Sequence, residues 1–85
     1  MYEIVVTPHA MRDLKRLPRT ILERVDSALL YLKQDPYIPG IKHLHNHKIA
    51  DYRIRVGDYR ILFDLDHIKK LIIVLRIRHR KDAYR

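Results

Sequence analysis

Arginines recur at alternate positions in the segment DYRIRVGDYRILF, which covers residues 51–63. Arg53 and Arg55 precede a Gly57-Asp58 pair, and Arg60 follows it. A guanidinium group stays protonated at neutral pH, and its planar fork of donors matches the oxygens of a phosphate. Near the Gly57-Asp58 pair this set of side chains is only positive. The pattern therefore predicts a binding site for an anion, and phosphate is the anion that arginine suits best.

The residues between these arginines form a second, apolar set. Its members are Tyr52, Ile54, Val56, Tyr59, Ile61 and Phe63. Alternation of this kind, interrupted by two turn residues, predicts a β-hairpin in which Arg55 lies opposite Arg60. Like charges directly across a strand pair destabilise the pair by about 0.2–1 kcal/mol. We therefore expect the arginine face to gain stability from a bound anion.

A last strand is expected from Lys70 to about Arg78, with Leu71, Ile73, Leu75 and Ile77 on the apolar face. A three-residue turn at 67–69 places Arg76 opposite Arg60. Arg55, Arg60 and Arg76 then form a row across three strands, with Arg53 and Arg78 one step away. The alternative is that these side chains spread into solvent, where salt screens their repulsion over about 10 Å.

The elements before the hairpin are predicted to be one strand and two helices. Tyr2–Thr7 reads as a strand, and Thr7 followed by Pro8 is a helix start that continues to Pro18. A capping box at Thr20–Glu23 begins the second helix, which ends at Asp35-Pro36. From Lys42 onward the period changes to two, giving three or four strands. This order predicts a single α+β domain over residues 1–85, with both helices packed on one face of an antiparallel sheet of four to five strands.

Composition limits the classes of function. The 85 residues carry a formal net charge of +8, and the last ten, RIRHRKDAYR, hold five bases and one acid. Such a charge attracts polyanions, nucleic acid first. The absence of cysteine excludes disulfides, thiolate zinc sites and a thiol nucleophile. No signal sequence or membrane-spanning run is present, so we expect a cytoplasmic protein that does not enter a membrane.

Three histidines, His43, His45 and His47, are spaced two apart in HLHNH. They could face one way on an extended segment, as zinc ligands do. No carboxylate or thiol lies close to them in sequence, so we expect a nucleic-acid contact or plain surface here, and no metal or other cofactor.

Three stretches of the chain resemble the RelE/ParE toxin family of bacterial and archaeal toxin–antitoxin systems. The opening MYEIVVTPHAMRDLKRLP resembles the family's first strand and helix. YRIRVGDYRILF is similar to its hairpin, and LRIRHRKDAYR to its closing pattern of His-Arg and Tyr. The resemblance covers essentially the whole chain. It implies a twisted antiparallel sheet with two N-terminal helices on one side, in agreement with the elements expected above.

The resemblance implies a ribosome-dependent mRNA endoribonuclease, in which the ribose 2′-OH attacks the adjacent phosphate and the 5′-oxygen leaves. Arg53 and Arg55 occupy positions where the best-known members have lysines. By the same resemblance Arg60 holds the scissile phosphate, Arg80 stabilises the developing charge, and Tyr84 stacks on or orients the base.

The residue that moves the proton is a separate question, because arginine is a poor general base. We expect His79 to take this part, since imidazole titrates near neutral pH. Lys48, Lys81 and Tyr84 are the other titratable candidates. The expected catalytic residues are Arg55, Arg60, His79, Arg80 and Tyr84, and the expected RNA-binding residues are Lys48, Arg53, Arg76, Arg78 and Lys81.

The family also implies partners: an acidic, partly disordered antitoxin, the ribosome with its mRNA, and operator DNA through the antitoxin complex. Two alternatives stay open. One is a ParE-like inhibitor of DNA gyrase with the same fold and no nuclease activity, and the other is a bare RNA- or DNA-binding module.

Overall fold

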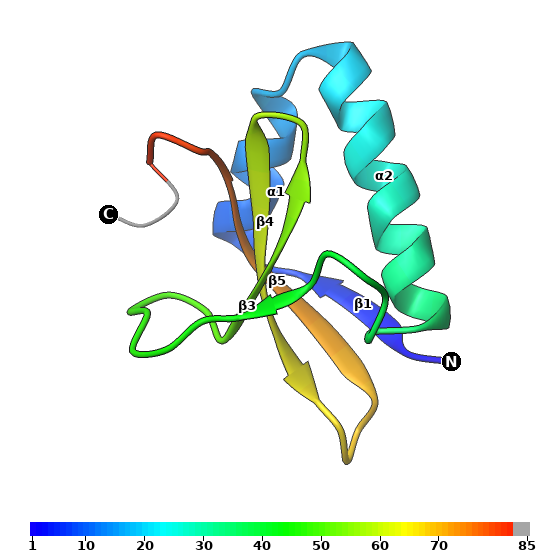
Figure 1. The fold of residues 1–85 in the computed structure, drawn as a ribbon. Helices are drawn as coiled ribbons and strands as arrows, with labels where there is room; N and C mark the ends of the chain where they lie inside the picture. The colour runs from blue at the N-terminus through cyan, green and yellow to red at the C-terminus, as the bar shows by residue number, and fades with distance from the viewer. Residues whose placement is uncertain (83–85) are drawn as a thin grey trace.

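A computed structural model describes residues 1–82 of the chain (Figure 1). The elements are β1 (Glu3–Val6), α1 (Pro8–Lys15), α2 (Arg19–Gln34), β2 (Lys42–His43), β3 (Tyr52–Val56), β4 (Tyr59–Asp66) and β5 (Leu71–His79). The predicted α+β class is confirmed. Figure 1 shows α2 along one side of the sheet, while the loop after β2 and the turn after β5 lie on the other side.

The helix starts show why each helix forms where it does. Thr7 caps α1, because its Oγ1 accepts a hydrogen bond from the Ala10 amide at 3.2 Å, and Pro8 opens the helix as predicted. The helix ends at Lys15, before the expected Pro18. The predicted capping box at Thr20–Glu23 is wrong. Pro18, whose backbone is extended, precedes the first residue of α2 and makes no side-chain cap, so Thr20 already lies inside the helix.

The sheet has the strand order β1-β5-β4-β3-β2. The pairs from β2 to β5 are antiparallel, whereas β1 pairs parallel to β5. The sheet is therefore mixed and not antiparallel throughout. The reason is the connection: α1 and α2 lie between β1 and the rest of the sheet, and parallel pairing requires a crossover of this kind.

The β3–β4 hairpin has the predicted register. Arg55 lies opposite Arg60, Ile54 opposite Ile61, and Val56 opposite Tyr59. Gly57 has a positive φ of 57°, which glycine adopts without the steric cost that a Cβ imposes.

The predicted β4–β5 register is wrong. The turn has four residues, 67–70, and the Asp66 carboxylate stabilises it by accepting the amides of Ile68 and Lys69. Phe63 therefore lies opposite Val74, whereas the expected turn at 67–69 would have placed it opposite Ile73. A bulge between Leu62 and Phe63 shifts the pairing once more.

The two shifts change which residues of β5 are buried. Ile72 and Val74 are fully buried and Ile77 nearly so, whereas Leu71, Ile73 and Leu75 are only partly buried. Of the four residues predicted for the apolar face, only Ile77 lies in the main core.

Apolar side chains pack on both faces of the sheet. The main core lies between the helices and the sheet and includes Val25, Leu29, Ile54, Ile61 and Phe63. On the opposite face, Leu44, Ala50 and Leu62 form a second, small cluster with Ile49 and Leu75. The loop after β2 thus covers part of the face that the sequence pattern assigned to arginines. Neither helix of the described segment is long and apolar enough to span a membrane.

Candidate anion-binding site on the sheet

Three arginines lie side by side across three strands, and we call them the arginine row: Arg55, Arg60 and Arg78. Arg60 is paired in register with Arg55 of β3 on one side and with Arg78 of β5 on the other. Arg78 therefore takes the place that the sequence analysis assigned to Arg76. A row of three arginines is present as predicted, but its member on β5 is Arg78 and not Arg76.

Arg60 is the most buried member of the arginine row, with 9% of its surface exposed. Its Nη1 donates to the carbonyl oxygens of Gly57 at 3.1 Å and Tyr59 at 2.9 Å. Its Nε is buried and has no hydrogen-bond partner within the described part of the chain. Two neutral carbonyls do not balance a full positive charge, and desolvation makes that imbalance costly. An anion against the row would offset this cost.

Arg53 is also buried, at 7% exposure, but its surroundings differ. It pairs in register with Lys42 of β2, and its Nη1 donates to the Gly40 carbonyl at 3.2 Å. Its Nε, like that of Arg60, has no partner among residues 1–82. Arg53 fixes the loop before β2 to the sheet, and its expected contact with RNA stays a prediction.

Arg55 is exposed and lies on an edge of β3 that no other strand of the described residues 1–82 covers, because β2 pairs only with Tyr52 and Arg53. Arg55 lines a hollow of about 500 Å³ together with Arg24 and Tyr31 of α2. Arg55 thus forms the outer end of the row, next to the second helix.

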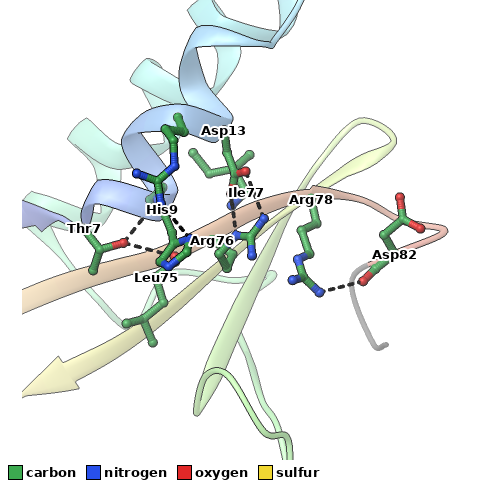
Figure 2. A network of polar contacts seen from close by, with 10 residues as sticks. Thr7, His9, Asp13, Leu75, Arg76, Ile77, Arg78 and Asp82 are labelled. Carbon is green, nitrogen blue, oxygen red and sulfur yellow. Dashed lines mark hydrogen bonds and ion pairs between the residues drawn. The ribbon is translucent and has the colours of Figure 1, made fainter.

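Arg76 has a carboxylate partner, which the sequence analysis missed. Its Nε donates to Asp13 Oδ2 at 2.8 Å, and its Nη2 donates to Asp13 Oδ1 at 3.1 Å (Figure 2). Burial would raise the pKa of Asp13, but the hydrogen bonds from Arg76 and from the Ile77 amide hold that pKa below its ordinary value. The same bond raises the pKa of Arg76. Since this charge is already balanced, we leave Arg76 out of the candidate site.

His79 lies on the other face of the sheet from the arginine row. It is opposite Tyr59, with the two rings edge to face at 5.3 Å, and Tyr59 packs against the main core. His79 Nδ1 accepts the Lys81 amide at 3.3 Å. The structure does not bring His79 together with Arg60.

The residues after β5 turn back toward the β3–β4 hairpin. The Arg80 amide donates to the Asp58 carbonyl at 2.7 Å, so the side chain of Arg80 starts beside the hairpin turn. Arg78 Nη1 donates to the Asp82 carbonyl at 3.2 Å (Figure 2). Arg80 and Lys81 are exposed. Tyr84, the expected base-stacking residue, lies outside the described residues.

The loop after β2 carries Lys48 and the three histidines. Lys48 is exposed, whereas His47 Nδ1 accepts the amides of Ile49 and Ala50 and so shapes the loop. His43 and His45 contact each other edge to face at 4.9 Å. Within residues 1–82, no three potential ligands gather closely enough to hold a metal ion.

Asp13 is the residue of this region that the sequence reasoning overlooked. Only 11% of its side chain is exposed, and its carboxylate also accepts the Ile77 amide at 3.0 Å. A signal was present: Asp13 follows the buried Ala10 by three residues, which puts it on the core-facing side of α1. A carboxylate on such a side requires a partner.

Comparisons with known proteins agree with this architecture. The family model for the ParE toxin of type II toxin–antitoxin systems, parDE, matches residues 4–84. Toxin RelG of Mycobacterium tuberculosis is 35% identical over 85 residues, which cover 99% of this chain and 97% of that protein. Putative toxin RelE1 of Methanocaldococcus jannaschii is 29% identical over 87 residues, with 99% and 96% covered.

Solved toxin structures also share the fold of this chain. The toxin–antitoxin complex RelBE2 of Mycobacterium tuberculosis contains a chain that matches with a TM-score of 0.81 and 30% identity, covering 92% of this chain and 96% of that one. The archaeal RelE–RelB complex from Pyrococcus horikoshii matches with a TM-score of 0.80 and 25% identity, covering 96% and 98%.

Proposed function

Because the chain belongs to the RelE/ParE family of type II toxin–antitoxin toxins, we propose that it is the nuclease kind of toxin, an endoribonuclease that cuts mRNA on the ribosome. Two of the similar proteins named above are toxin RelG and putative toxin RelE1. The basic charge of +8 suits a nucleic-acid substrate.

The observation that carries this proposal is the arginine row. Arg60 is buried, and its charge is balanced by no carboxylate of residues 1–82, while Arg55 and Arg78 flank it on neighbouring strands. An RNA backbone placed against the row, with the scissile phosphate at Arg60, meets donors from three strands. The resulting charge-assisted hydrogen bonds are stronger than neutral ones.

In the proposed reaction the ribose 2′-OH attacks the adjacent phosphorus, a cyclic phosphate forms, and the 5′-oxygen of the next nucleotide leaves. Negative charge grows on the phosphate oxygens as the bond to the 2′-oxygen forms. Arg60 and Arg78 stabilise this charge from fixed strand positions, and Arg80 joins them from the turn beside Asp58. The arginines supply charge stabilisation and not proton transfer.

The position of His79 bears on the proton-transfer step. Its ring packs against Tyr59 on the helix side of the sheet, and its Nδ1 accepts the Lys81 amide. We therefore propose that His79 supports the strand end and takes no direct part in cleavage. Lys48, Lys81 and Tyr84 stay the titratable candidates for this step.

The test is induced expression of the toxin without an antitoxin, followed by primer extension on a reporter mRNA. Breaks at fixed codon positions with 5′-hydroxyl ends are expected from the wild-type chain. Arg60→Ala and Arg78→Ala should remove these breaks, and His79→Ala should keep them. Arg19→Ala is the matched control, because Arg19 is an exposed arginine of α2 that pairs only with the neighbouring Glu23 in the described structure. Killing by both row variants would refute the assigned site.

A second candidate is inhibition of DNA gyrase without nuclease activity. The specific observation in its favour is that the matching family model is the one for the ParE toxin. Intact reporter mRNA together with induced DNA damage in the same experiment would support this candidate and refute the nuclease.

We also propose a cognate antitoxin as the partner that neutralises the toxin. The similar chains from Mycobacterium tuberculosis and Pyrococcus horikoshii were solved in complex with their antitoxins. An acidic partner suits a surface with a charge of +8. Contact with operator DNA is proposed only through this complex. Co-expression of the cognate antitoxin is expected to restore growth.

A further inference from the structure

The second half of β5 is held by α1 instead of by a strand. The parallel partner β1 ends at Val6, which pairs with Val74, so the edge of β5 from Leu75 onward has no neighbouring strand on that side within residues 1–82. Thr7 Oγ1 donates to the Leu75 carbonyl at 3.1 Å, and Asp13 Oδ2 accepts the Ile77 amide at 3.0 Å. Figure 2 shows these contacts from Thr7, which caps α1, and from Asp13 of α1 along the strand. The helix thereby satisfies the backbone groups of an open sheet edge.

The same stretch of β5 contains the bulge. Phe63 pairs with Val74 and Leu62 pairs with Arg76, so Leu75 is the extra residue. Without the bulge, the register that pairs Phe63 with Val74 would continue along both strands. Arg60 would then lie opposite Ile77, and the side chain of Arg78 would point to the other face of the sheet. The bulge is therefore the feature that places Arg78 beside Arg60.

Asp13 contacts the strand directly after the bulge, with both carboxylate oxygens in use. The oxygens accept hydrogen bonds from the Arg76 guanidinium, at 2.8 and 3.1 Å, and from the Ile77 amide. The carboxylate lies mostly out of solvent, which strengthens such bonds and makes their loss costly. Arg76 and Ile77 are the two residues that precede Arg78, so their positions determine where its side chain begins.

We propose that Asp13 is a positioning residue for the reaction: it fixes the β5 bulge and thereby holds Arg78 in line with Arg60. Asp13 touches no substrate in this scheme. The inference deepens the proposed nuclease function and rests on it.

The test compares cleavage kinetics of Asp13→Ala, Asp13→Asn and Asp13→Glu with the wild-type chain. Because Arg78 acts on charge that develops in the transition state, Asp13→Ala is expected to lower kcat about 10- to 100-fold, with KM changed less than about threefold. Asp13→Asn keeps an acceptor for the Ile77 amide but removes the negative charge that faces Arg76. We therefore expect a decrease in kcat that is smaller than in Asp13→Ala. Asp13→Glu restores a carboxylate and should recover part of the rate.

Two controls separate positioning from mere stability. Leu29→Ala removes a core side chain on α2, away from the bulge, and should keep kcat while it lowers stability. Arg12→Ala changes an exposed residue of the same helix as Asp13 and should leave both kcat and stability unchanged.

A double-mutant comparison shows whether Asp13 acts through Arg78. In the Arg78→Ala background, removal of Asp13 should change kcat less than about twofold, because the residue that it positions is gone. Full additivity of the two losses, or a wild-type kcat in Asp13→Ala, would overturn the inference.

Amide hydrogen exchange distinguishes failure of this inference from failure of the proposed function. The Ile77 amide should lose protection in Asp13→Ala whatever the chain does to RNA. If the wild-type chain cuts no RNA, the nuclease proposal fails and the role of Asp13 in catalysis fails with it, while exchange still shows whether Asp13 holds the bulge. Unchanged protection in a nuclease-active protein would refute the positioning role alone.

Discussion

Arginines that look alike in the sequence have different surroundings in this protein. Arg76 is neutralised by Asp13, Arg53 is tied to the Gly40 carbonyl, and Arg55 is exposed at a strand edge. Arg60 alone among them combines burial with a central place in the row. The residue type indicated an anion site, but the surroundings decide which arginine serves it.

Arg60→Met should separate activity from stability. The substitution replaces a buried, unbalanced charge by an apolar side chain of similar length, which is often neutral or stabilising by about 1 kcal/mol or more. We expect the free energy of unfolding to stay the same or rise, while RNA cleavage falls about 100-fold or more. Urea denaturation and a cleavage assay measure the two quantities. A loss of more than about 1 kcal/mol in stability would contradict the unbalanced charge.

At the scale of elements, the strands and helices could be predicted from the sequence because their period and turn residues are local. Thr7-Pro8 gave the start of α1, and the two-residue turn gave the β3–β4 register. The β4–β5 register could not be predicted, since the turn gains a residue through Asp66 and the bulge depends on Asp13, which is 63 residues from Arg76. Because of that error, the predicted row contained Arg76, whereas the structure places Arg78 there.

The contact between α1 and β5 predicts a pH dependence of stability. The pKa of Asp13 is lowered in the folded chain, so its stabilising effect is complete above the ordinary carboxyl pKa of 3.8 and is lost as the pH falls through the lower folded value. Asp13→Asn should cost about 2 kcal/mol at pH 7, and this difference should shrink as the pH falls from 7 to below 3.8. Urea denaturation of both proteins across this range measures it. A difference that stays constant with pH would contradict the ion pair.

The hairpin turn gives a second prediction for an element. Gly57 has a positive φ, and a Cβ placed there would meet Arg24 Nη1 at 2.9 Å. Gly57→Val should therefore lower the free energy of unfolding by about 1–3 kcal/mol, and Gly57→Asn by less, because asparagine tolerates the left-handed conformation. Thermal unfolding of the two variants tests the order. Equal losses would show that the backbone conformation does not limit this position.

For the whole molecule, the main core on the helix side and the small cluster on the opposite face together support the strands that carry the arginine row. The helices cover one face, and the loop after β2 covers part of the other through Leu44 and Ala50 packed on Leu62. Leu62 is the neighbour of Ile61 on β4 and two residues from Arg60, so this small cluster supports the strand beside the row. Sequence alternation alone missed it because Leu62 falls on the face assigned to the arginines, and Leu44 and Ala50 precede the hairpin pattern.

The basic charge of the molecule predicts how RNA binding depends on salt. If the three row arginines each neutralise one phosphate of a single strand, log K should fall with log salt concentration with a slope of about −2. Arg60→Ala should reduce the size of this slope by about 0.7, since one phosphate contact is lost. Lys69→Ala changes the net charge equally but lies in the exposed turn at the other end of β4 from Arg60, so its slope should match the wild-type chain. Fluorescence anisotropy with a short single-stranded RNA, titrated at several salt concentrations, measures the slopes. Equal reductions in both variants would mean that the overall charge of +8, and not the arginine row, binds the RNA.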